Sequence, residues 1–382
     1  MLRFLDAGES HGKALVAIIE GFPAKLKIDE NFINKNLMLR QSGYGRGGRQ
    51  KIEKDRVEFL SGVRFLETIG SPITMMIHNR DFENWAKIMA YNAEYTNEKN
   101  VTSPRPGHAD LVGYLKYDRV DIRDVLERSS ARETAIRVAV GSLCEYALTK
   151  LGVKIISFVK SIGSIECNPD YNDSEFEDKI EKSPVFCPDE KAGNLMIAEI
   201  EQAKKEGDSV GGCVETIVEG VVEGLGSYAQ WDRKLDARLS FSLMSIQAIK
   251  AVEIGDGIDN SKRFGSFVHD EIIYNGRYKR KTNRAGGIEG GMSNGERIIT
   301  RAYMKPIPTL VKGLDSVDIV TKHAKKSAFE RSDVCAVPAL SIVAKSVVAF
   351  EIFNAYLEKF GSDTMDELID RVNAYKEYLS KK

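Results

Sequence analysis

The spacing of apolar residues predicts three long helices. Along the first helix the apolar positions repeat at the period of one helix face: Ile136, Val140, Leu143 and Ala147. Ser130 and Glu133 have the spacing of a capping box at its start, and Gly152 is suited to its end. These features predict a helix that begins near Ser130 and ends before Gly152.

The second and third helices differ in how apolar they are. Pro338 suits a first helical turn, and the helix runs to about Phe360, before Gly361. Its apolar residues cover nearly every face: Leu340, Val343, Val347, Phe350 and Phe353. A helix of this kind is expected to be buried on most sides. The third helix, residues 364–379, is amphipathic, and Thr364 and Glu367 form a second possible capping box.

Stretches rich in Val and Ile between these helices predict strands. They are residues 153–165, 213–222, 248–254 and 297–304. Residues 168–182 and 280–295 read as loops, and neither resembles an interdomain linker. Because strands and helices do not alternate regularly, we expect a layered α+β fold and not a Rossmann sheet, in a single domain of residues 1–382.

Composition and charge then limit the possible functions. The chain has 382 residues with 55 Lys and Arg against 56 Asp and Glu, a net charge of -1. Such a chain is a poor candidate for coating nucleic acid by bulk charge, so any anion must bind at a local cluster. The 5 cysteines contain no Cys-x-x-Cys pair, which predicts reduced thiols and no metal site.

Location is indicated by two further features. The first residues lack the basic and apolar regions of a signal peptide. The apolar region 336–350 is interrupted by polar residues and is shorter than the roughly 18 residues that a membrane span needs. We therefore expect a cytoplasmic protein that does not bind a membrane.

Two histidines lie in loops whose glycines and prolines suit the close approach of a ligand. The segment Gly8-Glu-Ser-His-Gly12 places His11 beside Ser10 between glycines, where a ligand can come close to the backbone. A nucleophilic Ser–His pair is an alternative, although the Gly-x-Ser-x-Gly elbow is absent. In Thr102-Ser-Pro-Arg-Pro-Gly-His-Ala-Asp110, two prolines and a glycine fix the loop that carries His108, a candidate general acid.

Several segments concentrate arginines. Residues 40–49 combine Arg40, Arg46 and Arg49 with four glycines, which suits a small anion or, alternatively, RNA, or else a solvated loop. Arg128-Ser-Ser-Ala-Arg-Glu133 gathers hydroxyls and guanidinium groups at a helix start, either as an anion site or as a plain N-cap. Arg331-Ser-Asp333 alone would be a surface ion pair, and residues 305–309 and 286–295 add stiff or open loops.

Together these motifs, in this order and at these separations over nearly the whole chain, resemble the chorismate synthase family. The resemblance implies an anti-1,4 elimination that converts 5-enolpyruvylshikimate 3-phosphate into chorismate and phosphate, the last step of the shikimate pathway. It implies a carbon–oxygen lyase that needs reduced FMN without net redox change. The implied fold is a β-α-β sandwich with central helices between two antiparallel sheets, assembled as a homotetramer.

The resemblance also implies residue roles. His11, His108 and Asp333 would be catalytic, with Ser10 and Ser130 in proton relays. Arg46, Arg49, Arg105 and Arg132 would bind the phosphate and two carboxylates of the substrate. The implied cofactor contacts are Arg40 and Arg46 for NADP, and for FMN Arg128, Ser129, Ser130, Gln247, Ala248, Gly290, Lys305, Pro306, Ile307, Pro308, Thr309 and Arg331.

One departure and two alternatives accompany this interpretation. Some members of the family carry a Gly-rich run before the Arg-Ser-Ser-Ala-Arg motif, where this chain has Asp124-Val-Leu-Glu127. A net flavin oxidoreductase that uses NADPH is one alternative, and an RNA-binding module is the other. The motifs do not distinguish a protein that reduces its own flavin with NADPH from one that relies on an external flavin reductase.

Overall fold

The first sheet is built from the N-terminal part of the chain. A computed structural model describes residues 2–48, 53–330 and 332–382. Four antiparallel strands form the order β1 (Arg3–Ala7), β2 (Ala14–Glu20), β6 (Ile73–His78) and β3 (Glu58–Ser61). Leu15, Ala17 and Ile19 alternate along β2 and are buried, so one face of this sheet contributes to the core.

The second sheet holds the later strands. Its five antiparallel strands have the order β10 (Ile249–Ile254), β15 (Ile298–Met304), β9 (Gly212–Glu219), β7 (Lys154–Ile162) and β8 (Ile165–Glu166). Long ladders join β7 to β9 and β9 to β15, and most of β9 is buried.

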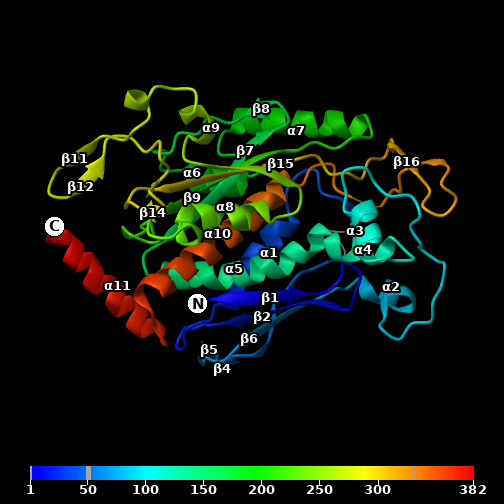
Figure 1. Cartoon of the computed structure of the whole chain (residues 1–382), viewed down its shortest axis with the longest axis horizontal. Helices are drawn as coiled ribbons and strands as arrows, with labels where there is room; N and C mark the ends of the chain where they lie inside the picture. Colours follow the sequence, from blue (N-terminus) through cyan, green and yellow to red (C-terminus); the bar gives the residue numbers. More distant parts are fainter. Residues whose placement is uncertain (1, 49–52, 331) are drawn as a thin grey trace.

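Three helices lie between the sheets: α1 (Glu30–Gln41), α5 (Thr134–Thr149) and α10 (Val337–Phe360). Helix α5 packs against β2 and β6, whereas α10 packs against β7 and β9 (Figure 1). The two helices also contact each other closely, and Gly141 of α5 lies against the backbone of Ser346 in α10. One hydrophobic core therefore includes side chains from both sheets and from the helices between them.

Helix α10 is long and apolar enough to cross a membrane by length and composition alone. In this structure 83% of its most apolar window is buried inside the protein. Its surroundings are those of a core helix, which is what its lack of a polar face requires.

Shorter elements cover the ends of these layers. At one end are α2 (Phe82–Met89), α3 (Asp110–Lys116), α4 (Arg123–Ser129), the 3₁₀ turn η2 (Ala131–Glu133) and the hairpin β16 (Asp315–Val317) with β17 (Ala324–Lys326). Val101, Ile122, Leu126 and Ile319 form a small core of their own beneath them.

The remaining elements lie around the second sheet or beside the first. They are α6 (Phe176–Lys182), α7 (Glu190–Lys205), α8 (Leu235–Met244), α9 (Gly257–Asn260), α11 (Met365–Ser380), the 3₁₀ turns η3 (Trp231–Arg233) and η4 (Gly265–Phe267), and the short hairpins β4 (Val63–Arg64) with β5 (Glu67–Thr68), β11 (Ile272–Tyr274) with β12 (Tyr278–Arg280), and β13 (Ile288–Glu289) with β14 (Met292–Ser293).

The predictions from periodicity are largely confirmed. The helices over α5, α10 and α11 are present, Pro338 lies in the first turn of α10, and Gly361 ends it. Thr364 caps α11 by accepting a hydrogen bond from the amide of Glu367. The four predicted strands correspond to β7, β9, β10 and β15, except that a turn at Gly163 separates β7 from β8. The mixed α and β class is confirmed.

Three local predictions are wrong. Ser130 caps the turn η2 and not an α-helix, because Arg132 and Glu133 are engaged by distant partners and α5 begins at Thr134. Residues 168–182 include helix α6, since the buried Phe176 and Ile180 anchor one helical face. Residues 280–295 contain the hairpin of β13 and β14. The first sheet, α1 and α4 were not predicted.

The contact between α5 and α10 gives a stability prediction. A Cβ atom at Gly141 would lie 2.1 Å from the carbonyl oxygen of Ser346, so Gly141→Ala must push the two helices apart. We expect a loss of about 2 kcal/mol in the free energy of unfolding, measured by urea denaturation. Gly193→Ala in α7 is the matched control, because its Cβ would meet only ordinary contacts at 3.6 Å or more, and a helical alanine is favoured. Equal effects of the two variants would contradict the close packing.

Candidate active site

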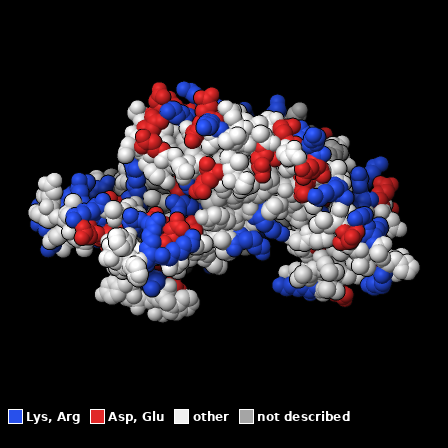
Figure 2. Space-filling view, turned by 90° about the horizontal axis from the view of Figure 1, so that it is seen from above, with Lys and Arg blue, Asp and Glu red and all other residues white. Residues whose placement is uncertain are grey.

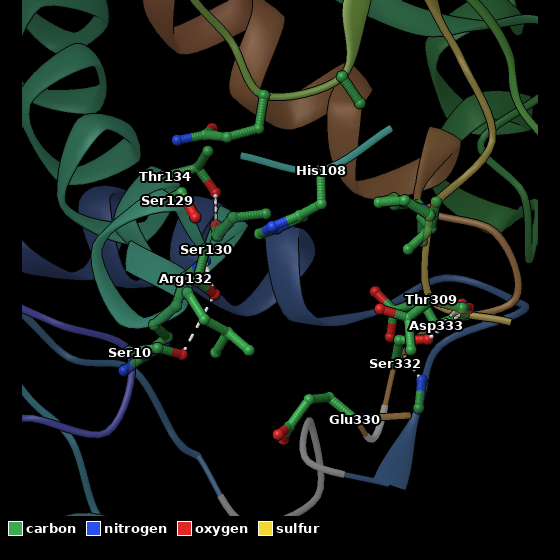
Figure 3. A pocket seen from close by; sticks show the side chains of 18 of the residues that line it. Ser10, His108, Ser129, Ser130, Arg132, Thr134, Thr309, Glu330, Ser332 and Asp333 are labelled. Carbon is green, nitrogen blue, oxygen red and sulfur yellow. Dashed lines mark hydrogen bonds between the residues drawn. The ribbon is translucent and has the colours of Figure 1, made fainter. Parts of the chain in front are cut away.

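One large cavity, of about 900 Å³, lies where the central helices meet the loops of both sheets. Its walls include most of the residues that the sequence singled out: Ser10, His11, Arg40, Arg46, Arg105, His108, Ser129, Ser130, Arg132, Gln247, Ala248, Lys305, Ile307, Pro308, Thr309 and Asp333. In Figure 3, Ser10, Ser130 and Arg132 lie on one side of the cavity and Thr309, Ser332 and Asp333 on the other. Segments from the two ends of the chain therefore share one site.

His108 is held by a buried carboxylate. Its Nδ1 lies 2.6 Å from Oδ1 of Asp110, and Arg105 donates three hydrogen bonds from its backbone and side chain to the same carboxylate within 3.0 Å. Burial alone would raise the pKa of Asp110, but the hydrogen bonds from His108 and Arg105 outweigh it and hold this pKa well below its usual range. Asp110 is therefore ionised and keeps His108 and Arg105 in place.

Ser10 and His11 lie in the turn between β1 and β2. Gly8 begins this turn with φ 114°, and a Cβ there would lie 2.4 Å from the carbonyl oxygen of Ala14, so only glycine fits. The hydroxyl of Ser130 donates to Oγ of Ser10 at 3.2 Å, which links this turn to the end of α4. His11 lies at the cavity wall with its side chain 12% exposed.

Two arginines share one buried carboxylate. Arg132 donates from one guanidinium nitrogen to both oxygens of Asp55 at 2.7 Å, and Arg40 lies 3.4 Å from the same group. Arg40 also donates to Thr134 and to the carbonyl oxygen of Ala131. Burial, together with the charge of nearby Arg132, lowers the pKa of Arg40 to about 9, so it remains cationic at neutral pH.

Two guanidinium N–H groups at the cavity wall are buried without hydrogen-bond partners among the described residues. They are NH2 of Arg132 and Nε of Arg46. Arg46 also pairs with Asp333 at 3.0 Å, and the other oxygen of Asp333 accepts from the amide of Gly47 at 2.6 Å. NH2 of Arg132 lies 3.7 Å from Oε2 of Glu53, an ion pair without a hydrogen bond. Cationic donors with unused hydrogen-bonding capacity are suited to an anionic ligand.

Part of the cavity wall is apolar with a few polar groups. Ile246, Met304, Ile307, Pro308, Leu340 and Val343 line it. Gln247 donates to Glu133 at 2.8 Å, while its buried Oε1 has no partner within the described part of the chain. Ala248 has φ 68°, a left-handed conformation that is strained for alanine and is often found at functional sites. This wall is suited to a flat, largely apolar ring with polar edges.

Three of the expected residues that the structure describes do not line the cavity. Arg128 points away and pairs with Asp6 near the first sheet. Gly290 lies in the hairpin of β13 and β14, and Pro306 does not line the cavity although its neighbours do. Arg49 and Arg331 lie outside the described residues.

Sequence reasoning missed several residues of the wall. They are Glu53, Asp81, Trp85, Lys99, Arg123 and Glu330. Asp55 and Glu127, which lie behind the wall, were also missed. Most of them lack a local motif, and they reach the site through partners far along the chain, such as Arg132 for Asp55 and His11 for Glu127. The only available signal was the position of Glu127 directly before Arg128, where the chain departs from the Gly-rich pattern.

The fold and this cavity indicate a class: an enzyme whose cavity, lined by both cationic and apolar groups, suits a polyanionic small molecule. The chorismate synthase family model matches residues 2–357. The chain is 55% identical to the chorismate synthase of Desulforamulus reducens, over 99% of both chains, and 54% identical to that of Syntrophotalea carbinolica, over 100% of this chain and 99% of the relative. A crystal structure of a chorismate synthase superposes with a TM-score of 0.80 at 40% identity, covering 100% of this chain and 99% of the other.

The chain therefore belongs to the chorismate synthase family. Its activity is that of this family, a carbon–oxygen lyase reaction on a phosphate ester. The resemblance inferred from the motifs is confirmed.

Glu133, behind Gln247, predicts a pH dependence of stability. Burial, and then a hydrogen bond with Asp6, raises the pKa of Glu133 to about 7. The protonated form thus stabilises the folded state fully below the ordinary pKa of 4.5, and this contribution is lost as the pH rises through 7. We expect Glu133→Gln, which mimics the protonated acid, to match the parent in melting temperature near pH 5 and to exceed it near pH 8.

The control is Glu20→Gln, which removes an exposed carboxylate paired with Arg3 on the first sheet. Surface pairs of this kind contribute little, so its melting temperature should follow the parent at both pH values. An equal shift for Glu133→Gln at both pH values would contradict the raised pKa.

Proposed function

We propose that this cavity converts 5-enolpyruvylshikimate 3-phosphate into chorismate and phosphate with reduced FMN as its cofactor. The observation that carries the proposal is the convergence of His11, His108, Arg132 and Asp333 on one cavity that also has apolar lining residues. A volume of about 900 Å³ lies at the upper end for ligand sites, as expected for a substrate and a cofactor together.

The residues present fit a flavin. The apolar wall matches the body of an isoalloxazine ring, and the unpartnered Oε1 of Gln247 is an acceptor for a ring N–H group. Gln247, Ala248, Lys305, Ile307, Pro308 and Thr309 would hold it there. When bound, reduced FMN supplies transient electron density to the allylic system of the substrate, which is returned at the end of the reaction.

The chain itself must stabilise the negative charge of the departing phosphate and assist the removal of one proton from the substrate. The elimination breaks the carbon–oxygen bond to phosphate and removes the proton on C6 of the ring. Arg46, Arg105 and Arg132 would bind the phosphate and carboxylates. Nε of Arg46 and NH2 of Arg132 make no hydrogen bond within the described residues, so each can still donate to an anion. His11 would stabilise the departing phosphate, since positive donors placed where charge develops lower the barrier.

Asp333 and His108 would serve the proton on the flavin side. Asp333 pairs with Arg46 and accepts from the amide of Gly47, with its side chain 16% exposed at the cavity wall. His108, oriented by Asp110, would face the edge of the cofactor. The hydrogen-bonded hydroxyls of Ser10 and Ser130 would extend the relay on the side of His11.

Four wider features complete the proposal. We infer a single domain of the β-α-β sandwich type, supported by the contacts of α5 and α10 with the two sheets. We infer that the protein is cytoplasmic. We also infer a homotetramer, and the apolar side chains on the open face of the first sheet, where Leu5 is 75% and Ile18 47% exposed, support contact with further copies of the chain. The reductant would be NADPH at this site or a separate flavin reductase.

The RNA-binding alternative is not favoured by the surface. Lysine and arginine side chains are interspersed with aspartate and glutamate over the face shown in Figure 2, and no continuous basic stripe crosses it. Together with the net charge of -1, this leaves little of the electrostatic footprint that such binding needs.

The reaction itself is the first test. With FMN reduced under anaerobic conditions, we expect the purified protein to release phosphate from 5-enolpyruvylshikimate 3-phosphate while the flavin spectrum is that of the reduced form after many turnovers. A folded protein that releases no phosphate would contradict the proposal, and stoichiometric oxidation of flavin or NADPH would favour an oxidoreductase. Activity in air with FMN and NADPH alone would identify the protein as its own flavin reductase.

The residue roles are tested by substitution. His108→Ala and Asp333→Ala should each lower kcat by about 100-fold or more, the usual size of a general acid–base contribution, while melting temperatures change little. His269→Ala is the matched control, because this exposed histidine lies outside the cavity. Rates within about 2-fold of the parent would remove these roles without removing the family assignment.

A further inference from the structure

Glu127 is a buried carboxylate directly behind His11. Its side chain is 0% exposed and lies near the end of α4. One oxygen lies 2.9 Å from Nδ1 of His11, and the other accepts from the backbone amide of His11 at 2.7 Å. The carbonyl oxygen of Glu127 also accepts from the amide of Ser10 at 2.9 Å. Glu127 thus binds both the backbone of the loop and the imidazole ring of His11.

The charge of Glu127 is secured by its surroundings. Burial alone would raise its pKa, but hydrogen bonds and charge from His11, and the charge of Arg123, outweigh burial and lower the pKa. Arg123 lies 3.3 Å from Glu127 and 2.7 Å from Glu330. An ionised carboxylate is only an acceptor, so Nδ1 of His11 must carry a proton in this contact.

The imidazole is also held by an aromatic contact. Its ring stacks on Trp85 with centroids 4.0 Å apart and an interplanar angle of 24°. Arg123 and Lys99 in turn lie over the indole of Trp85 at 5.2 and 5.4 Å. The second ring nitrogen, Nε2, lies 4.0 Å from Asp81, a residue of the cavity wall.

We propose that Glu127 is a positioning residue for the reaction: it keeps the proton of His11 on Nδ1 and so fixes Nε2 as the atom that meets the substrate. A neutral His11 then has its lone pair on Nε2, and a protonated His11 presents an N–H donor there, compensated by a buried negative charge. Asp110 holds His108 through Nδ1 in the same way, so both histidines of the cavity follow one design. This inference deepens the proposed function, on which it rests.

The step that Glu127 would affect is the departure of phosphate. Transition-state stabilisation needs a donor aimed at one point before the reaction begins. Without the Glu127 carboxylate, a neutral His11 could carry its proton on Nε2. The imidazolium form of His11 would then have no buried negative charge to balance its own charge. Groups that orient a functional imidazole in this manner typically contribute about 10–100-fold.

The test is Glu127→Gln in the full-length protein. The amide oxygen can still accept from the backbone of His11, but the amide NH₂ then faces Nδ1 and requires it to be an acceptor. We expect kcat to fall about 30-fold with KM changed less than about 3-fold. In protein labelled with ¹⁵N-histidine, the signal of neutral His11, assigned by its absence in His11→Ala, should change from the Nδ1–H to the Nε2–H tautomer.

Two further variants keep the outcome decisive. Glu127→Asp retains the charge and should recover part of kcat and the Nδ1–H tautomer. The same two measurements on Glu127→Asp would test the proposal if Glu127→Gln does not fold. Asp124→Asn on the same helix, whose carboxylate is exposed and pairs with Arg119, should change neither readout. A normal rate or an unchanged tautomer in Glu127→Gln would overturn the proposal. The tautomer does not depend on turnover, so this outcome is distinct from failure of the proposed reaction or of the role of His11.

Discussion

The site depends on burying positive groups against fixed carboxylates. Asp55, Asp110 and Glu127 have side chains with no exposed surface, and each contacts two cationic or imidazole groups. Burying guanidinium groups without such partners would cost several kcal/mol each. The pairing lets the chain keep its cations in a partly enclosed cavity and in defined directions. A protein with almost no net charge can therefore present a strongly anion-binding site.

The layered fold brings these groups together. Helices α1, α5 and α10 lie between the sheets, and the loops at one end of this helical layer meet at the cavity. The first sheet contributes the turn with Ser10 and His11, whereas the second contributes the segments around Gln247 and Lys305. The cationic and apolar groups of the cavity therefore come from several layers and loops that meet at one end of the helices.

The fold was predictable only in part from the pattern of residues. The all-round apolar character of α10 and the period of α5 are strong signals, and the strands of the second sheet are marked by their density of Val and Ile. In the first sheet β2 is as long as β15 and alternates buried and less buried positions, yet it was not predicted. Helix α6 was hidden because only Phe176 and Ile180 mark its buried face. Such elements are stabilised by tertiary packing more than by their own sequence.

By itself, the sequence determined the family and the positions of its motifs, because glycine, proline, serine and charged residues in fixed order constrain the local backbone and the chemistry together. It did not determine which carboxylate holds which cation. Glu127 lies 116 positions from His11, and Asp55 lies 77 from Arg132. Arg128, the first residue of a motif, pairs with Asp6 and does not line the cavity. Only the tertiary structure decides these partners, since burial requires every charge to find an opposite one wherever the packed layers place it.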